Sequence, residues 1–255
     1  MTYLRSFLFA LFLILIAPIY GLCALLVMPF PLDVRHRFMI AWAPIILSVA
    51  RVLLGIRFRV IGRENLPQGM AVILSKHQSA WETMAFHMIF PPVSFVLKRE
   101  LLWVPFMGWG FAQIAHIAIN RKSAKNALNQ LAEQGCANLK AGYWVAIFPE
   151  GTRVVLGEEG EYRAGGAMLA KRAGVPIVPV AHNAGEFWPK NAFVKRPGEI
   201  IVSIGPPIDV AGKKASALNA EAQAWIEGEM RRLFPHHYAA ATAVTEAAAQ
   251  PPDGA

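Results

Sequence analysis

Charged side chains are scarce in this sequence of 255 residues. Asp, Glu, Lys and Arg make up 16% of the chain, against about 25% in an ordinary soluble domain, while 55% of the chain is hydrophobic. Residues 6–32 contain no charged side chain, and this run exceeds the ~20 residues that cross the hydrocarbon core of a bilayer as a helix. The sequence therefore predicts that residues 1–56 form a membrane-associated helical segment.

The apolar N-terminal segment allows more than one arrangement. A cleaved signal peptide also begins with a basic residue, but this run is longer than a usual apolar signal region and no small-x-small cleavage site follows it. A second apolar run, residues 38–50, is followed by Arg51, so we expect it to lie in the interface or to dip into one leaflet. Pro18, Pro29 and Pro31 interrupt the segment, which leaves both a spanning helix and a re-entrant hairpin open.

Cysteine and several catalytic motifs are nearly or wholly missing. The two cysteines, Cys23 and Cys136, lie far apart without metal-ligand spacing, so the sequence predicts neither a disulfide framework nor a metal site. There is no G-x-G-x-x-G after a strand, no P-loop, no H-E-x-x-H and no G-x-S-x-G. These absences argue against a dinucleotide-dependent dehydrogenase, a nucleotide-driven motor, a zinc protease and a standard serine hydrolase.

After the apolar segment, short runs rich in β-forming residues alternate with helical patterns. We expect strands at residues 58–61, 70–75, 93–97, 114–119, 144–148, 177–181 and 200–204. Helical patterns occupy residues 80–89, 123–139, 166–172 and 216–234. This alternation predicts a single α/β domain, residues 57–234, with a mostly parallel, mixed sheet flanked by helices. Residues 235–255 are rich in Ala, Thr, Gln and Pro, and we expect a disordered tail there.

A histidine and a carboxylate follow the second expected strand. If His77 lies in the loop and a helix begins near Ser79, Glu82 falls in the first turn and reaches back to the imidazole. That arrangement makes a base with an orienting acid. The alternative is structural, because Ser79-x-x-Glu82 is also a capping-box pattern. A second histidine, His182, has no carboxylate at a matching offset, and we expect it to be structural or to support the site from behind the residues that touch the substrate.

The expected strand at residues 144–148 runs into a turn with three polar side chains. The turn has the sequence Phe-Pro-Glu-Gly-Thr-Arg, residues 148–153. Gly151 lets the backbone approach a ligand closely. Arg153 offers a planar fork that matches a phosphate, and Thr152 adds a donor. An ordinary turn closed by a salt bridge between Glu150 and Arg153 is the alternative. Binding is favoured, since functional residues concentrate in loops at strand ends.

Further cations and aromatic residues follow other strands. Lys98 and Arg121 come at the ends of two neighbouring expected strands. The net charge of +8 points to anionic partners such as phospholipid head groups, phosphorylated substrates or nucleic acid. Trp103, Phe106 and Trp109 suit contact with an acyl chain or a membrane surface.

Four blocks of this sequence, in their order, resemble the glycerolipid acyltransferase family, and most closely the bacterial 1-acyl-sn-glycerol-3-phosphate acyltransferases. The family's Asn-His-x4-Asp block is matched by Lys76-His77-x4-Glu82, with Lys for Asn and Glu for Asp. Its Phe-Pro-Glu-Gly-Thr-Arg block is present in full. Its basic pair with Pro-x-x-Gly and a later Arg, and its Val-Pro-rich strand, are matched by Lys98, Arg99, Pro105, Gly108, Arg121 and residues 175–180.

The resemblance implies roles for these residues. His77 would be the catalytic base and Glu82 its orienting acid. The substrate phosphate would be bound by Arg153, Thr152, Gly151, Glu150, Lys98 and Arg121. The implied acceptor is lysophosphatidic acid, and the implied donor is acyl-CoA or acyl carrier protein, with no bound cofactor, no metal and no nucleic acid. The resemblance also implies contact with membrane lipids in a bacterial inner membrane, with the active site on the cytoplasmic face.

Two other functions remain open from the residues. The acceptor is not fixed by the phosphate-binding turn, so a lyso-ornithine lipid, another lysophospholipid or glycerol 3-phosphate are alternatives. A non-catalytic lipid-binding protein would explain the apolar segment and the positive charge. It would not explain why His77 with Glu82, and Glu150 with Arg153, both follow strands of one predicted parallel sheet.

Overall fold

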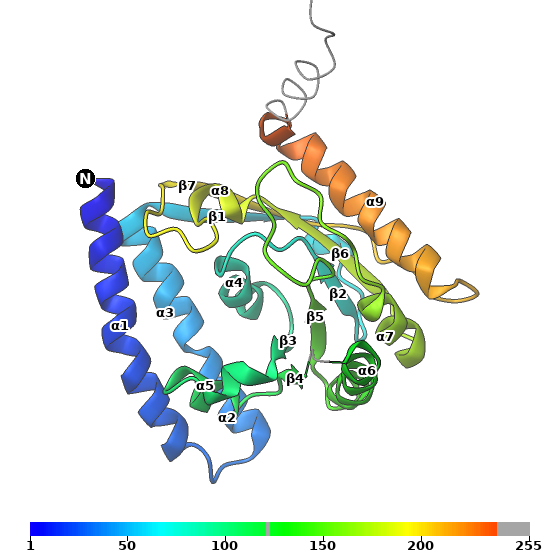
Figure 1. Ribbon diagram of the computed structural model, residues 1–255, viewed down its shortest axis with the longest axis horizontal. Coiled ribbons are helices and arrows are strands. Elements are labelled where there is room, and N and C mark those ends of the chain that lie inside the picture. Colours follow the sequence, from blue (N-terminus) through cyan, green and yellow to red (C-terminus); the bar gives the residue numbers. More distant parts are fainter. Residues whose placement is uncertain (121–122, 239–255) are drawn as a thin grey trace, which may run out of the picture.

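One mixed sheet forms the centre of the computed structural model, which describes residues 1–120 and 123–238 (Figure 1). The strand order is β1-β7-β6-β2-β5-β3-β4; β6 and β7 are antiparallel, and every other neighbouring pair is parallel. The strands are β1 (Ile56–Ile61), β2 (Val72–Ser75), β3 (Val93–Lys98), β4 (Ile117–Ile119), β5 (Trp144–Ile147), β6 (Ile177–His182) and β7 (Gly198–Ile204). The predicted mostly parallel, mixed sheet is confirmed, with each of its seven expected strands present.

The helices match the expected pattern after the N-terminal segment and add several short turns. In chain order they are α1 (Thr2–Leu26), α2 (Leu32–Ile40), α3 (Trp42–Val49), the π-helical turn η1 (Ala50–Leu54), the 3-10 turn η2 (Arg63–Asn65), α4 (Trp81–Ile89), the 3-10 turn η3 (Arg99–Trp103), α5 (Met107–Phe111), α6 (Ala124–Lys140), α7 (Gly165–Ala173), α8 (Ala184–Phe187) and α9 (Ala215–Leu233).

Apolar side chains cover both faces of the sheet. Along β2, Ile73 joins one apolar cluster with residues of α1, α3 and α4, whereas Val72 and Leu74 join a second cluster with residues of α6, α7 and α9. Figure 1 shows these two groups of helices on opposite sides of the sheet. Burial on both faces explains why the central strands read as continuous apolar runs.

The N-terminal segment packs onto the domain along part of its length. Phe9 of α1 is fully buried and meets the ring of Trp188 edge to face, with 5.1 Å between ring centroids. Ser6, also in α1, accepts a hydrogen bond from the backbone N–H of Lys195. Buried residues of α3 and η1 belong to the same apolar cluster as α4. The segment therefore supplies part of the cover for one face of the sheet.

The outward side of the N-terminal segment is apolar and exposed. Side chains at helical spacing along α1 lie open to solvent: Leu4, Leu8, Leu11, Leu15, Ile19, Leu22 and Leu26. Two helical stretches are long and apolar enough to cross a membrane, Thr2–Leu26 and Leu32–Leu54. The second stretch was expected to be shorter. It reaches 23 residues because α2, α3 and η1 follow one another directly and include the charged residues before Phe38.

Candidate active site

The carboxyl ends of the parallel strands β6, β2, β5, β3 and β4 meet at one edge of the sheet. This edge is where open α/β sheets bind their ligands. β2 delivers Lys76 and His77 to it, β5 delivers the turn at residues 148–153, and Lys98 ends β3 with an exposed side chain. Three of the predicted groups thus lie on the same edge. Arg121, which follows β4, lies outside the described residues.

His77 lies in the loop between β2 and α4, as expected. α4 begins at Trp81, whose backbone N–H donates to the Ser79 hydroxyl. Glu82 reaches back from the first turn, and its Oε1 accepts the backbone N–H groups of Ser79, at 2.8 Å, and Gln78, at 3.0 Å. The residue before the helix is Ala80 rather than Ser79. One bond of the predicted capping box is therefore present, the bond from the Ser79 N–H to Glu82. The Ser79 hydroxyl, however, accepts the N–H of Trp81, and Ser79 lies one residue before the N-cap position.

The same carboxylate oxygen of Glu82 meets the imidazole. Nδ1 of His77 lies 2.8 Å from Oε1 of Glu82. Burial favours a raised pKa for the fully buried Glu82, but His182, the bond from His77 and the Ser79 N–H outweigh it, so the pKa of Glu82 is lowered. Glu82 is therefore ionised and can only accept, which makes Nδ1 of His77 the donor. Nε2 is then the nitrogen of the neutral ring that carries a lone pair.

The ring of His77 is held flat against Phe148. The two rings stack with centroids 4.0 Å apart and an angle of 14° between their planes. His77 also lines a cavity of about 500 Å³. The cavity is bordered by Gly151 and Arg163 near the histidine and by apolar side chains of α6 and α7, among them Leu128, Leu131 and Met168. An imidazole, a guanidinium and several apolar side chains thus line one cavity.

The turn at residues 148–153 places its glycine against this cavity. Gly151 has a φ of +68°, and a Cβ at this position would lie 3.2 Å from the guanidinium of Arg163. A side chain would therefore be strained here and would crowd the cation. Thr152 is exposed and Arg153 is half-buried. Lys190 donates to the Thr152 hydroxyl and to the carbonyl oxygen of Arg153, which adds a cation that tethers the turn.

Glu150 turns away from the cavity. Its carboxylate is buried, accepts the backbone N–H of His77 at 2.7 Å and forms an ion pair with Lys76 at 2.8 Å. Burial raises the pKa of Glu150 to about 7, although Lys76 and the His77 N–H act in the opposite direction. In the described part of the chain, the ion pair between Glu150 and Arg153 that was the alternative is not formed. The carboxylate of Glu150 is paired with Lys76. Glu150 thus contacts the backbone of the base.

The predicted aromatic contacts divide into two kinds. Trp103 is 80% exposed and Trp109 is 36% exposed, so both are available to a surface. Phe106 is half-buried, with its backbone against Gly21 of α1 and its ring 5.0 Å from that of Trp109. This short region therefore joins α1 to the edge of the sheet where His77 lies.

His182 is structural, as expected. It is fully buried, and its Nε2 lies 2.9 Å from the carbonyl oxygen of Lys76. Its Nδ1 accepts the backbone N–H of Ala184, so Nε2 is the donor. Burial lowers the pKa of His182, in spite of the nearby Glu82. The role of His182 is to hold the chain immediately before His77.

Sequence reasoning missed three residues near the site. Arg163 faces Gly151 from the far end of the same connection between β5 and α7, and only its position just before a run of small residues at the start of α7 hinted at a role. Lys190 comes from the loop after α8, and no local signal marks it. Glu227 of α9 contacts Lys76 from 151 residues away in the chain, and periodicity marks it only as a helical residue.

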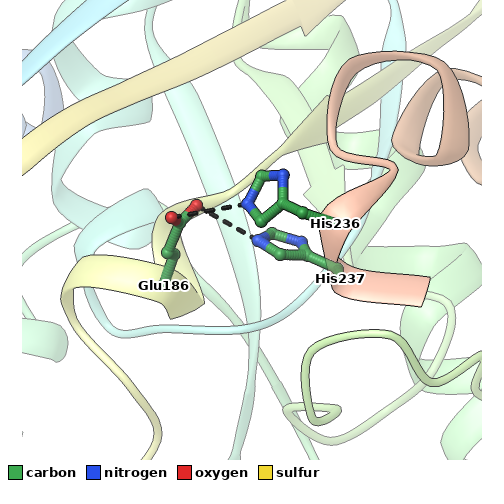
Figure 2. Close-up of side chains that lie close together, drawn as sticks. All are labelled: Glu186, His236 and His237. Carbon is green, nitrogen blue, oxygen red and sulfur yellow. Dashed lines mark hydrogen bonds and ion pairs between the residues drawn. The ribbon is translucent and has the colours of Figure 1, made fainter. Parts of the chain in front are cut away.

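One cluster in the described residues has the ligand types of a metal site. Glu186 of α8 faces His236 and His237, with their possible ligand atoms within 4.8 Å of one another (Figure 2). Nε2 of His237 lies 3.1 Å from Glu186, and Nε2 of His236 lies 3.5 Å from it. These contacts hold residues 235–238, which the sequence placed in a disordered tail, against the domain; the rest of that tail lies outside the described residues. The cluster shares no residue with the His77 site.

Comparisons with known proteins agree with this geometry. The acyltransferase family matches residues 57–183. The 1-acyl-sn-glycerol-3-phosphate acyltransferase of Pseudomonas aeruginosa is 46% identical over 237 residues, 91% of this chain and 92% of that protein. The yeast enzyme of the same name is 33% identical over 63% of this chain and 54% of its own length.

A solved structure shares the fold. The crystal structure of the 1-acyl-sn-glycerophosphate acyltransferase of Thermotoga maritima superposes with a TM-score of 0.74 at 22% identity, over 91% of this chain and 95% of that one. The blocks around His77 and residues 148–153, the shared fold and the identity to the Pseudomonas protein lead to one conclusion: this chain is an acyltransferase of the 1-acyl-sn-glycerol-3-phosphate acyltransferase family.

Proposed function

We propose that this protein transfers a fatty acyl group from acyl-CoA or acyl carrier protein to the sn-2 hydroxyl of 1-acylglycerol 3-phosphate and so makes phosphatidic acid. The observation that carries the proposal is the 2.8 Å contact between His77 Nδ1 and Glu82 at the mouth of the cavity. It leaves His77 Nε2 ready to accept a proton. The relatives named for this reaction supply the choice of substrates.

The proposed reaction is a direct transfer. Nε2 of His77 takes the hydroxyl proton while the hydroxyl oxygen attacks the thioester carbonyl carbon. Glu82 stabilises the imidazolium that forms, because its carboxylate is ionised and bonded to Nδ1. When the tetrahedral intermediate collapses, the carbon–sulfur bond breaks, and the imidazolium returns the proton to the thiolate. Positioned proton transfer of this kind contributes roughly 10²–10⁴-fold in rate.

The cations at the sheet edge would bind the phosphate of the acceptor. The guanidinium groups of Arg153 and Arg163 form no ion pair within residues 1–120 and 123–238, so both are available to an anion. Gly151 and Thr152 come directly before Arg153 in the chain and offer close backbone approach and a hydroxyl. Lys98 and Arg121 remain further candidates for the phosphate or for the phosphates of the donor. Glu150 would act on this site indirectly, through the backbone of His77.

The apolar part of the cavity would take a fatty acyl chain. Side chains of α6 and α7, such as Leu128 and Met168, line the same cavity as His77. An acyl chain bound there would place its carbonyl near the base. Trp103 and Trp109, exposed near α1, would contact the membrane in which both acylated substrates reside.

We further propose that the N-terminal helices hold the enzyme on the cytoplasmic side of a bacterial inner membrane. Two helical stretches are apolar enough to enter the bilayer, and the outer side of α1 is exposed and apolar. Because α1 also packs on the domain, a hairpin of the two stretches would keep the cavity close to the lipid surface. Acyl-CoA and acyl carrier protein would reach this face from the cytoplasm.

The proposal is tested with the purified full chain in lipid-containing micelles. Radiolabelled acyl-CoA and acyl carrier protein are each offered with 1-acylglycerol 3-phosphate, a lyso-ornithine lipid, a neutral lysophospholipid and glycerol 3-phosphate. We expect the phosphorylated monoacyl acceptor to be used best, with its acyl group at sn-2. Preference for a different acceptor would move the proposal within the acyltransferase class, whereas lipid binding without any transfer would refute the catalytic proposal.

A further inference from the structure

Lys76 leaves β2 immediately before the base, but its side chain points into the protein. It is completely buried, and its ammonium makes three contacts: with Glu150 at 2.8 Å, with Glu227 of α9 at 2.8 Å and with the carbonyl oxygen of Glu158 at 3.0 Å. The contacts with Glu227 and with the Glu158 carbonyl are hydrogen bonds, and the contact with Glu150 is an ion pair. A buried lysine with these three partners is held in one place.

The partners of Lys76 connect three separate segments. Glu150 belongs to the turn after β5, Glu158 to the loop that follows it, and Glu227 to α9. Tyr162 donates its hydroxyl to the same oxygen of Glu227 at 2.8 Å, and burial raises the pKa of Tyr162, so this donor stays protonated. α9 lies outside the stretch that matches the acyltransferase family, residues 57–183.

The two carboxylate oxygens of Glu150 have different partners. Oε1 faces the ammonium of Lys76, and Oε2 accepts the backbone N–H of His77 at 2.7 Å. The carbonyl oxygen of His77 accepts the N–H of Val154 at 2.8 Å. The backbone of the base is therefore fixed on both sides by the segment that carries the phosphate-binding turn. The position of Glu150, in turn, depends on Lys76.

We propose that Lys76 is a positioning residue whose ammonium, neutralised by Glu227 of α9, holds Glu150 so that Glu150 fixes the backbone of His77 against the turn at residues 148–153. This inference rests on the proposed role of His77 as the base. It assigns α9 a part in the reaction although no residue of α9 lines the cavity. It also predicts that changes at Lys76 and Glu227 are not additive, because a buried carboxylate that has lost its cation is costly.

Three variants test the proposal: Lys76→Met, Glu227→Gln and the double variant. Lys76→Met leaves two buried carboxylates without their cation, so Glu150 shifts and kcat falls by about 10²-fold, the cost of a misplacement of about 1 Å. The KM for the phosphorylated acceptor stays near that of the wild type, because Arg153 and Arg163 are untouched. Glu227→Gln leaves the pair of Lys76 and Glu150 balanced and costs little. The double variant recovers part of the loss of Lys76→Met, because one buried carboxylate fewer lacks a cation.

A matched pair on the same helix serves as the control. Glu221 of α9 forms an ion pair with Lys213 at 2.7 Å, but both side chains are partly exposed. Lys213→Met and Glu221→Gln should leave kcat, KM and the exchange rate of the His77 amide unchanged.

Hydrogen exchange supplies a measurement that does not depend on activity. In Lys76→Met, the amide hydrogens of a peptide that covers residues 72–81 should exchange faster than in the wild type, and those of a peptide from β7 should not. If no acceptor is turned over by the wild type, the proposed function fails and this exchange result still decides the role of Lys76.

Two results would overturn the proposal. One is a Lys76→Met enzyme with unchanged kcat and unchanged exchange at residues 72–81, whatever its melting temperature. The other is a double variant as slow as Lys76→Met alone, which would remove α9 from the mechanism. If Lys76→Met cannot be purified as a folded protein, the double variant is compared with Glu227→Gln. An unchanged kcat together with unchanged exchange at residues 72–81 in this comparison would overturn the proposal in the same way.

Discussion

Lys76 and His77 are neighbours at the end of one strand and have opposite environments. His77 faces the cavity, stacks on Phe148 and meets a carboxylate through one ring nitrogen. Lys76 faces the interior, and its charge is surrounded by two carboxylates and a carbonyl oxygen. Each is a basic side chain within reach of a glutamate. The side chain of His77 lines the cavity, whereas that of Lys76 is completely buried, which matches the reactive role proposed for His77 and the positioning role proposed for Lys76.

The two carboxylates that serve these neighbours differ in the same way. Glu82 has a lowered pKa because positive and hydrogen-bonding groups outweigh its burial. Glu150 has a pKa raised to about 7 because burial outweighs Lys76. At neutral pH Glu82 is a charged partner for the imidazolium, whereas Glu150 is only partly charged. Burial alone thus does not predict the protonation of a carboxylate; the number of donors around it decides.

Removal of the base should have the largest effect on the cavity side. His77→Ala loses the proton acceptor, and we expect kcat to fall by roughly 10²–10⁴-fold, with membrane association unchanged. Steady-state acyl transfer and flotation with vesicles measure the two properties. His236→Ala, which removes an exposed histidine that also faces a glutamate, is the matched control and should retain full activity. Normal turnover by His77→Ala would remove His77 as the base.

Neutralisation of the orienting acid should be nearly as severe. In Glu82→Gln the amide no longer stabilises the imidazolium and can donate to Nδ1, which would move the ring proton to Nε2 and block the base. We expect kcat to fall by about 10²-fold or more, with KM little changed. Glu64→Gln, at an exposed position, is the control. A pH–rate profile that is identical in Glu82→Gln and the wild type would contradict the pairing of Glu82 with His77.

Loss of the phosphate cations should act on binding and leave the base intact. Arg153→Ala and Arg163→Ala each remove a charge-assisted contact worth about 1.5–3 kcal/mol, so we expect KM for the phosphorylated acceptor to rise roughly 10–100-fold. KM for the acyl donor reports whether the effect is specific to the acceptor. Arg172→Ala, at the exposed end of α7, should change neither constant. An unchanged KM in both variants would move the phosphate to Lys98 or elsewhere.

The smallest effect is expected for the interior residue Glu150, and it concerns the pH dependence of protein stability. The folded pKa of Glu150, about 7, lies above its ordinary value of 4.5, so the native state binds more protons between these values. The stability that Glu150 contributes is therefore present below about pH 4.5 and is lost as the pH rises through 7, by up to about 3 kcal/mol.

Thermal unfolding in detergent measures this contribution. Between pH 5 and pH 8 the wild type should lose more stability than Glu150→Gln, which has no carboxyl group to titrate. The difference between the two proteins isolates Glu150 from the other titrating groups. Parallel curves for the two proteins would mean that Glu150 keeps an ordinary pKa, and would weaken the contrast with Glu82.

Much of the fold could be predicted from local patterns in the sequence. The central strands are buried on both faces, so they stand out as continuous apolar runs, and helix stops at Gly142 and Gly174 separate them. Local patterns failed where distant segments meet. The stretch Leu32–Leu54 reads as a short apolar run, because the charged residues before Phe38 hide its helical continuation. Residues 235–238 fall in the stretch that was expected to be disordered, and contacts with residues of the domain, among them Glu186, hold them in place (Figure 2).

By itself, the sequence determined the class of fold, the block with His77 and Glu82, and the turn with Arg153. These features depend on residues close together in the chain, where strand periodicity, helix starts and turn chemistry act. The tertiary structure alone decided which way each side chain faces. Glu150 and Lys76 meet in the interior, where Glu227, 151 residues from Lys76 in the chain, also contacts the ammonium. Arg163 reaches the cavity because the long connection between β5 and α7 folds back on itself at Gly151, where a glycine leaves room for it.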